Sequence, residues 1–208
     1  SVAFKDTIQF RLTVIDSYYS TQMSKRLYGI EDIANELVKY SDEVLKVEID
    51  NFLQNPTKGI IKELFNKNYG FNKEAKNPKK AISLLSKYLY FLSDCQFPIY
   101  DTLGKVSYNL LKDNKYITLK ALTDDNYFEL MIALNQTSNI KDFEKLDNLL
   151  WLLGKIKEGS FSILMDKSKY ETIVKQVDFS KAVKSQEKDK AIRKYIQDNY
   201  IRSNLFNS

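Results

Sequence analysis

Apolar residues recur at spacings of three and four along most of this chain, which is the period of an amphipathic α-helix. Ile8, Leu12 and Ile15 follow this spacing and predict a first helix over residues 3–16. The same period predicts further helices over residues 30–40, 42–54, 56–65, 78–93, 101–113, 124–134, 142–157 and 181–201. We therefore predict an all-α fold, a single domain of about eight or nine helices over residues 1–208.

Three segments break the helical period. Residues 17–29 are polar, aromatic and irregular, and they predict a loop followed by a short turn. Residues 66–80 hold five lysines and one glutamate, a composition typical of a linker. This segment divides the single domain into two candidate sub-lobes, residues 1–76 and 77–208. Residues 113–123 fit either a short β-like excursion or a loop.

The two most apolar helices, over residues 81–92 and 143–156, are expected at the centre of the core. Each carries apolar residues around much of its surface, so we expect the two helices to cover each other's faces. The expected core includes Leu85, Leu89, Phe91, Leu150 and Trp151.

Composition agrees with a globular protein that has no membrane span. Of 208 residues, 43% are apolar and 28% are charged, and six glycines with three prolines are few for a turn-dense all-β fold. No uncharged apolar run reaches about 18 residues, and no secretion signal is visible. The single cysteine, Cys95, cannot form an internal disulfide. We therefore expect a cytoplasmic location and no membrane partner.

The chain contains no histidine, which limits the chemistry that it could perform. The commonest general base, the Ser-His and Cys-His nucleophile pairs and most zinc sites are all excluded. We expect neither a metal site nor a cofactor. Any catalysis would have to use aspartate, glutamate, lysine or tyrosine side chains.

Lys87 and Asp101 are the first pair of candidate functional residues. Lys87 interrupts an apolar helix, where the simplest interpretation is a lysine whose stem lines the core. The functional alternatives are an amine whose pKa is lowered by its apolar surroundings and a buried cation that pairs with an acid or a phosphate. Asp101 ends the turn at residues 97–101, directly before a helix. It is either a helix N-cap or a carboxylate that faces a cleft and acts on a substrate.

The segment from Asp16 to Met23 is the second unusual cluster. Asp16 ends a helix, where the helix dipole disfavours an acid, and this misfit predicts a specific partner. Tyr18, Tyr19 and Thr21 could stack on and hydrogen-bond a planar ligand such as a base. The alternative is a loop anchored by its own aromatic side chains.

The net charge is +5 and the isoelectric point is about 9.0, which is compatible with a polyanionic partner. The segment 66–80 interleaves its lysines with Tyr69 and Phe71, a pattern that suits single-stranded or flipped bases. Solvated surface is the alternative for such a charge run. The candidate phosphate-binding lysines are Lys76, Lys79 and Lys80.

The helix at 81–92, the Phe-Pro-Ile-Tyr-Asp turn at 97–101 and the helix after it resemble the second half of the helix-hairpin-helix base-excision DNA glycosylases. The likeness is strongest to the branch that removes oxidised guanine. In that branch a helix leads to a Pro-hydrophobic turn that ends in the catalytic aspartate, and the resemblance implies this role for Asp101. The candidates for the nucleophilic lysine of the bifunctional enzymes are Lys79, Lys80 and Lys87.

Two further segments are similar to uncharacterised bacterial relatives of these glycosylases: the motif Leu150-Trp151-x-x-Gly154-Lys155 and residues 16–21. The resemblance implies a DNA-glycosylase-like helical scaffold and a role in DNA repair.

Two function classes follow from the sequence. The first is a helical protein that interacts with DNA through its basic surface and is related to base-excision glycosylases. The second is a non-catalytic module that binds another protein or a small ligand. Whether the chain is an enzyme stays open at this point. DNA affinity that falls steeply with salt would distinguish the first class from the second.

Overall fold

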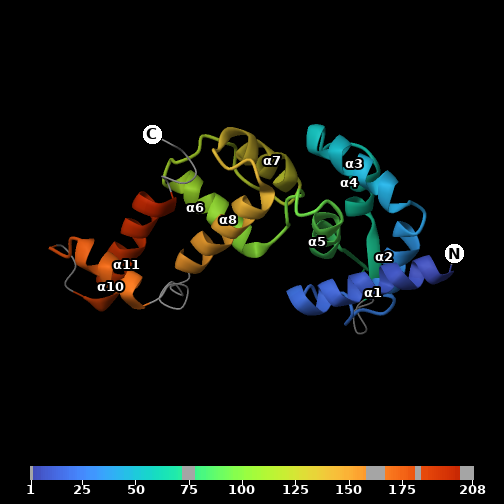
Figure 1. The fold of residues 1–208 in the computed structure, drawn as a ribbon, viewed down its shortest axis with the longest axis horizontal. Coiled ribbons are helices and arrows are strands. Elements are labelled where there is room, and N and C mark those ends of the chain that lie inside the picture. Colours follow the sequence, from blue (N-terminus) through green and yellow to red (C-terminus); the bar gives the residue numbers. More distant parts are fainter. Residues whose placement is uncertain (1, 72–77, 158–166, 181–183, 202–208) are drawn as a thin grey trace. The chain divides into compact units, whose positions relative to one another are not determined.

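The computed structural model describes residues 2–71, 78–157, 167–180 and 184–201 (Figure 1). Within these ranges the chain forms ten α-helices and one small two-stranded sheet, so the predicted all-α class is confirmed. No described helix is both long and apolar enough to cross a membrane.

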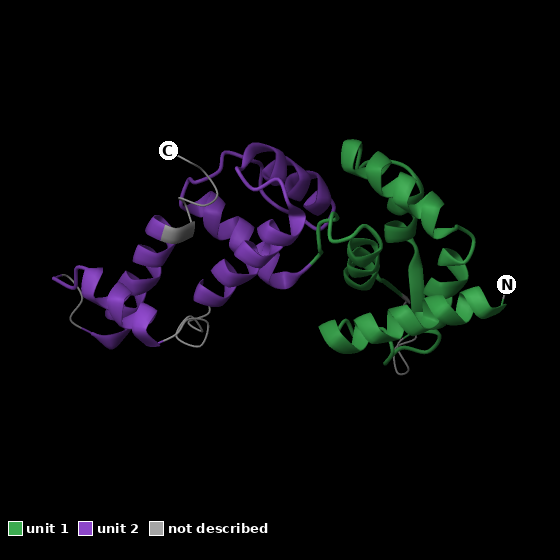
Figure 2. Ribbon diagram, viewed as in Figure 1, with its two compact units in different colours: residues 1–100 green, residues 101–208 purple. Residues whose placement is uncertain are grey.

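The chain divides into two compact units, Ser1–Tyr100 and Asp101–Ser208 (Figure 2). The division falls after Tyr100, whereas the sequence placed a sub-lobe boundary after residue 76. The reason is that the segment around residue 76 lies between two paired strands, which tie the residues on both sides of it into the first unit.

Five helices build the first unit. They are α1 (Val2–Tyr19), α2 (Gly29–Leu37), α3 (Asp42–Gln54), α4 (Ile60–Asn66) and α5 (Ile82–Leu92). Helix α5 packs against α1, α3 and α4, and α1 also packs against α2. Because three helices surround α5, its sequence is apolar over most of its circumference, and even Ser86 and Lys87 are buried.

A β-hairpin stands where the sequence predicted a linker. Strand β1 (Asn68–Phe71) pairs antiparallel with β2 (Pro78–Lys80), and a further bridge joins Leu27 to Phe71. Gly70 makes this approach possible, because it has φ +57° and a Cβ there would lie 2.7 Å from the Cα of Gly29. The helix expected to begin at residue 78 therefore begins only at Ile82.

The second unit contains α6 (Thr102–Asp113), α7 (Tyr127–Thr137), α8 (Phe143–Lys157), α10 (Lys167–Gln176), α11 (Ser185–Ile196) and a π-helical turn, η1 (Gln197–Ile201). Helix α6 packs on α8 at a close contact: a Cβ on Gly154 would lie 3.0 Å from the Cβ of Leu103. Between α6 and α7, residues 117–123 adopt no regular structure, in agreement with the loop alternative.

Two of the five expected core residues are not buried. Leu85, Leu89 and Leu150 are in the core, but Phe91 is 48% exposed and Trp151 is 41% exposed. Phe91 lies two positions beyond Leu89, about 200° around the helix, and therefore faces away from the buried side. Each of the two apolar helices finds its covering helices within its own unit, α5 against α1, α3 and α4, and α8 against α6.

Candidate functional site

Asp16 is buried in the last turn of α1 and holds the turn that follows this helix. Its carboxylate accepts hydrogen bonds from the Thr21 hydroxyl, from the backbone N–H of Met23 at 2.8 Å and from that of Ser24 at 3.0 Å. The residues between include two with positive φ, Ser20 and Gln22. The partner that the sequence required for Asp16 is therefore the chain's own turn, and Thr21 is part of it.

The pKa of Asp16 reflects two opposing effects. Burial raises it, while the hydrogen bonds from Ser24, Thr21 and Met23 lower it by more, so the carboxyl titrates below its ordinary range. The group is ionised at neutral pH and acts as a charged acceptor inside the fold.

The two tyrosines at the end of α1 have different environments. Their rings meet edge to face, with centroids 4.9 Å apart. Tyr18 is 81% exposed and could stack on a ligand. Tyr19 is half-buried, and its ring lies under the ammonium of Lys87, 5.3 Å from the ring centroid, and beside the ring of Phe91.

Lys87 is 3% exposed, and its ammonium is held inside the first unit. Its Nζ donates to Ser83 Oγ at 2.8 Å and to the carbonyl oxygen of Tyr100 at 3.2 Å. The backbone N–H of Tyr100 donates to Ser86 Oγ at 3.0 Å. Helix α5 thus binds both polar backbone groups of Tyr100, the residue before Asp101 in the turn at residues 97–101.

Asp101 caps the N-terminus of α6. Its Oδ1 accepts hydrogen bonds from the backbone N–H groups of Leu103 and Gly104. Its Oδ2 accepts none from any residue that the structure describes, and the side chain is half-buried. The predicted N-cap is present, and it leaves one carboxylate oxygen available to a substrate.

The described strands of the hairpin carry two of the three candidate phosphate-binding lysines. Lys79 and Lys80 are exposed on β2, and neither forms an ion pair with a described residue. Lys76 lies outside the described residues. Phe71 is 44% exposed, but Tyr69 is buried and donates its hydroxyl hydrogen to the carbonyl oxygen of Leu64, so Tyr69 is a core residue and cannot stack on a base.

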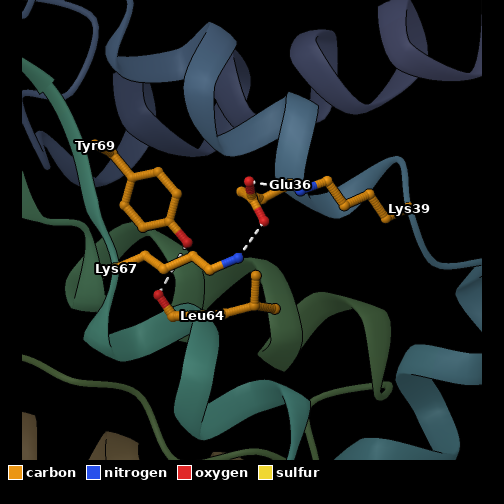
Figure 3. Close-up of polar contacts among 5 residues, drawn as sticks. All are labelled: Glu36, Lys39, Leu64, Lys67 and Tyr69. Atoms are coloured by element: carbon orange, nitrogen blue, oxygen red, sulfur yellow. Dashed lines mark hydrogen bonds and ion pairs between the residues drawn. The ribbon is translucent and has the colours of Figure 1, made fainter.

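Glu36 neutralises another lysine of this segment (Figure 3). Its carboxylate binds Lys39 at 2.7 Å and Lys67 at 2.5 Å, and Tyr69 and Leu64 lie beside the group. The hydrogen bonds from Lys39 and Lys67 lower the pKa of Glu36. Among the described lysines of residues 66–80, Lys67 is therefore paired with an acid, whereas Lys79 and Lys80 on β2 form no ion pair.

The structure brings three of the candidate residues together. In the first unit, Tyr18 contacts Tyr19, and Tyr19 contacts Lys87. Asp101 begins the second unit, and Lys79 and Lys80 belong to the hairpin.

Sequence reasoning missed the two serines of α5 that complete this arrangement. Ser83 lies four residues before Lys87, one helical turn away, so this spacing was a visible signal. The contact between Ser86 and Tyr100 depends on how the turn at residues 97–101 packs against α5, and no local sequence pattern predicts this packing.

Comparison with protein-family models, with curated proteins and with solved structures gives no match to this chain. Within the described ranges, no group of three or more Cys, Asp and Glu side chains could hold a metal ion.

Proposed function

We propose that this chain interacts with DNA and is related to the base-excision glycosylases, with Asp101 as its catalytic carboxylate. The observation that carries the proposal is the state of Asp101. One oxygen is fixed by two backbone N–H groups at the start of α6, and the other accepts no hydrogen bond from a described residue. A carboxylate held in this way is already oriented and needs no reorganisation when charge develops beside it.

The proposed reaction cleaves the bond between a base and its sugar. Positive charge develops on the sugar as the base leaves with the bonding electrons, and the free oxygen of Asp101 stabilises this charge. Water then adds to the sugar, and the same carboxylate orients the water and accepts its proton. The reaction needs no histidine, which this chain lacks.

Lys87 has a positioning role in this proposal. Its ammonium is buried and donates to Ser83 and to the carbonyl oxygen of Tyr100, the residue before Asp101. An amine acts as a nucleophile only when it is deprotonated and accessible. The buried and hydrogen-bonded amine therefore supports a role in holding the turn, and the proposal contains no covalent step through it.

The DNA contacts are assigned to the hairpin. Lys79 and Lys80 would bind phosphates. Phe71 on the paired strand β1 is 44% exposed, and Tyr28, the neighbour of the bridged Leu27, is 63% exposed, so both rings offer stacking surfaces. Phosphate contacts by lysine carry no sequence information, so the expected binding is general.

Charge reversal on the hairpin tests the DNA proposal. We expect the double variant Lys79→Glu/Lys80→Glu to bind duplex DNA more weakly at every sequence. The log–log dependence of affinity on salt should become shallower by about 2, because each phosphate contact contributes roughly 0.9 to this slope. Fluorescence anisotropy between about 20 and 200 mM salt measures both quantities.

The matched control is Lys58→Glu/Lys120→Glu, which reverses two exposed lysines that do not belong to the hairpin strands and changes the net charge equally. We expect it to retain most of the wild-type affinity and slope. Equal losses in the two double variants would show that only net charge matters, and no low-salt binding by the wild-type chain would refute the DNA proposal.

A further inference from the structure

Helices α1, α3 and α5 enclose a groove of about 440 Å³ within the first unit. Its apolar lining comes from Val14 and Ile15 of α1 and from Phe91 and Leu92 of α5. Phe91 and Val14 are 48% and 49% exposed, so they leave apolar surface at the groove uncovered. A volume of this size suits a small molecule with one or two rings.

Two buried polar atoms at this groove lack hydrogen bonds. Tyr88 is 2% exposed, and no described residue meets its hydroxyl at full hydrogen-bonding geometry. The Arg11 guanidinium lies close enough to act on the Tyr88 hydroxyl oxygen, which leaves the hydroxyl hydrogen without an acceptor among the described residues. Asp42 uses Oδ2 to bind Arg11 Nη1 at 2.9 Å, while its buried Oδ1 receives no hydrogen bond from the described part of the chain. A buried polar atom without a partner is costly, so an atom supplied by a ligand would be favoured here.

One of these two atoms accepts a hydrogen bond and the other donates one, so a ligand needs both a donor and an acceptor. Asp42 Oδ1 can only accept a hydrogen bond. Burial, together with the nearby charge of Asp42, raises the pKa of Tyr88 above its ordinary value, while Arg11 opposes this, so the hydroxyl stays protonated at neutral pH and can donate. A ligand that suits both carries a donor beside an acceptor.

The charges around the groove balance. Arg11 and Lys46 are positive, and Asp42 and Asp94 are negative. A lining with two charges of each sign gives no net preference for an anion or a cation, which favours an uncharged ligand.

We propose that this groove binds a small, uncharged aromatic carboxamide. The ring lies against Phe91 and Val14, the amide N–H donates to Asp42 Oδ1, and the amide oxygen accepts from the Tyr88 hydroxyl. This site lies entirely in the first unit and does not depend on DNA binding, so either proposal can fail alone.

The test is an NMR titration of the ¹⁵N-labelled chain with three probes. Benzamide has the ring, donor and acceptor, N,N-dimethylbenzamide lacks the donor, and benzoate lacks the donor and is charged. We expect saturable shifts with benzamide in the millimolar range, confined to residues around the groove. The other two probes should bind about fivefold to tenfold more weakly, because each loses a hydrogen bond.

Tyr88→Phe supplies the protein side of the test. It should weaken benzamide binding about fivefold to tenfold and leave the urea midpoint of the free protein unchanged or higher, because it removes an unpaired buried hydroxyl. Tyr18→Phe, on the exposed face of α1, should change neither quantity.

Three outcomes would overturn the proposal. They are the absence of saturable shifts with benzamide, equal affinity for the three probes, and a clearly lower urea midpoint for Tyr88→Phe. The last would show that the hydroxyl has a structural partner in the folded protein.

Discussion

Replacement of Asp16 by alanine is expected to lower the free energy of unfolding by about 3 kcal/mol or more. The carboxylate is 3% exposed and accepts hydrogen bonds from Thr21, Met23 and Ser24. Without it, the N–H of buried Met23 loses its acceptor, and the hydrogen bonds from Thr21 and Ser24 to the same charged group are lost as well. A hydrogen bond to a charged group contributes about 1.5–3 kcal/mol. Urea denaturation at pH 7 measures the difference.

The control is Asp6→Ala on the same helix. Asp6 is exposed and is expected to contribute less than about 0.5 kcal/mol, as most surface residues do. If Asp16→Ala were as stable as Asp6→Ala, the buried carboxylate would not be what holds this turn.

The cost of Asp16→Ala should also depend on pH. The pKa of Asp16 is lower in the folded protein than in the unfolded chain, so folding favours the ionised form. The resulting stabilisation is fully present above the unfolded pKa, near 4, and is lost as the pH falls through the folded pKa. We therefore expect the difference between wild type and Asp16→Ala to be largest at neutral pH and to shrink in acid. A difference that grows in acid would contradict the direction of the shift.

Replacement of Asp101 by asparagine is expected to reduce base release at least about 100-fold while changing stability by less than about 0.5 kcal/mol. Asparagine is as good an N-cap as aspartate, and its side-chain oxygen can accept from Leu103 and Gly104 as Asp101 does. It carries no negative charge to stabilise a sugar cation. Single-turnover kinetics and urea denaturation measure the two effects separately.

Two further variants complete this comparison. Asp113→Asn, at the other end of α6, removes an equal charge and should leave base release unchanged. Asp101→Ala should cost about 1 kcal/mol through loss of the cap. If Asp101→Ala left the free energy of unfolding unchanged or raised it, the carboxylate would serve function rather than helix capping.

Local rules predicted the helical class and some helix ends, but not the ends of α1, α4 and α5. Helix 42–54 has the predicted bounds, and Ser41 caps it by accepting from the backbone N–H of Val44. Asp101 caps α6 as expected. The misfit of an acid at the end of α1 correctly indicated a partner for Asp16, because the helix dipole disfavours an unpaired carboxylate in the last turn of any helix.

The hairpin, the exposure of Trp151 and the groove at Tyr88 could not be predicted from the sequence, because they depend on tertiary contacts. Strands of four and three residues are too short to show alternation, so a lysine-rich hairpin looked like a linker. The exposure of Trp151 depends on which face of α8 meets α6, and a helix apolar on several faces does not reveal this. The groove at Tyr88 exists only because three helices that are distant in sequence converge there.

The most direct test of the proposed function is a single-turnover assay with a duplex that contains one oxidised guanine opposite cytosine. The chain is used in excess over the duplex at about 50 mM salt, where phosphate contacts are strong. Free oxidised guanine and an abasic site are expected with the wild-type chain, and neither is expected with Asp101→Asn. If the wild-type chain binds the duplex and releases no base, Asp101 is a helix cap only, and the glycosylase proposal is wrong.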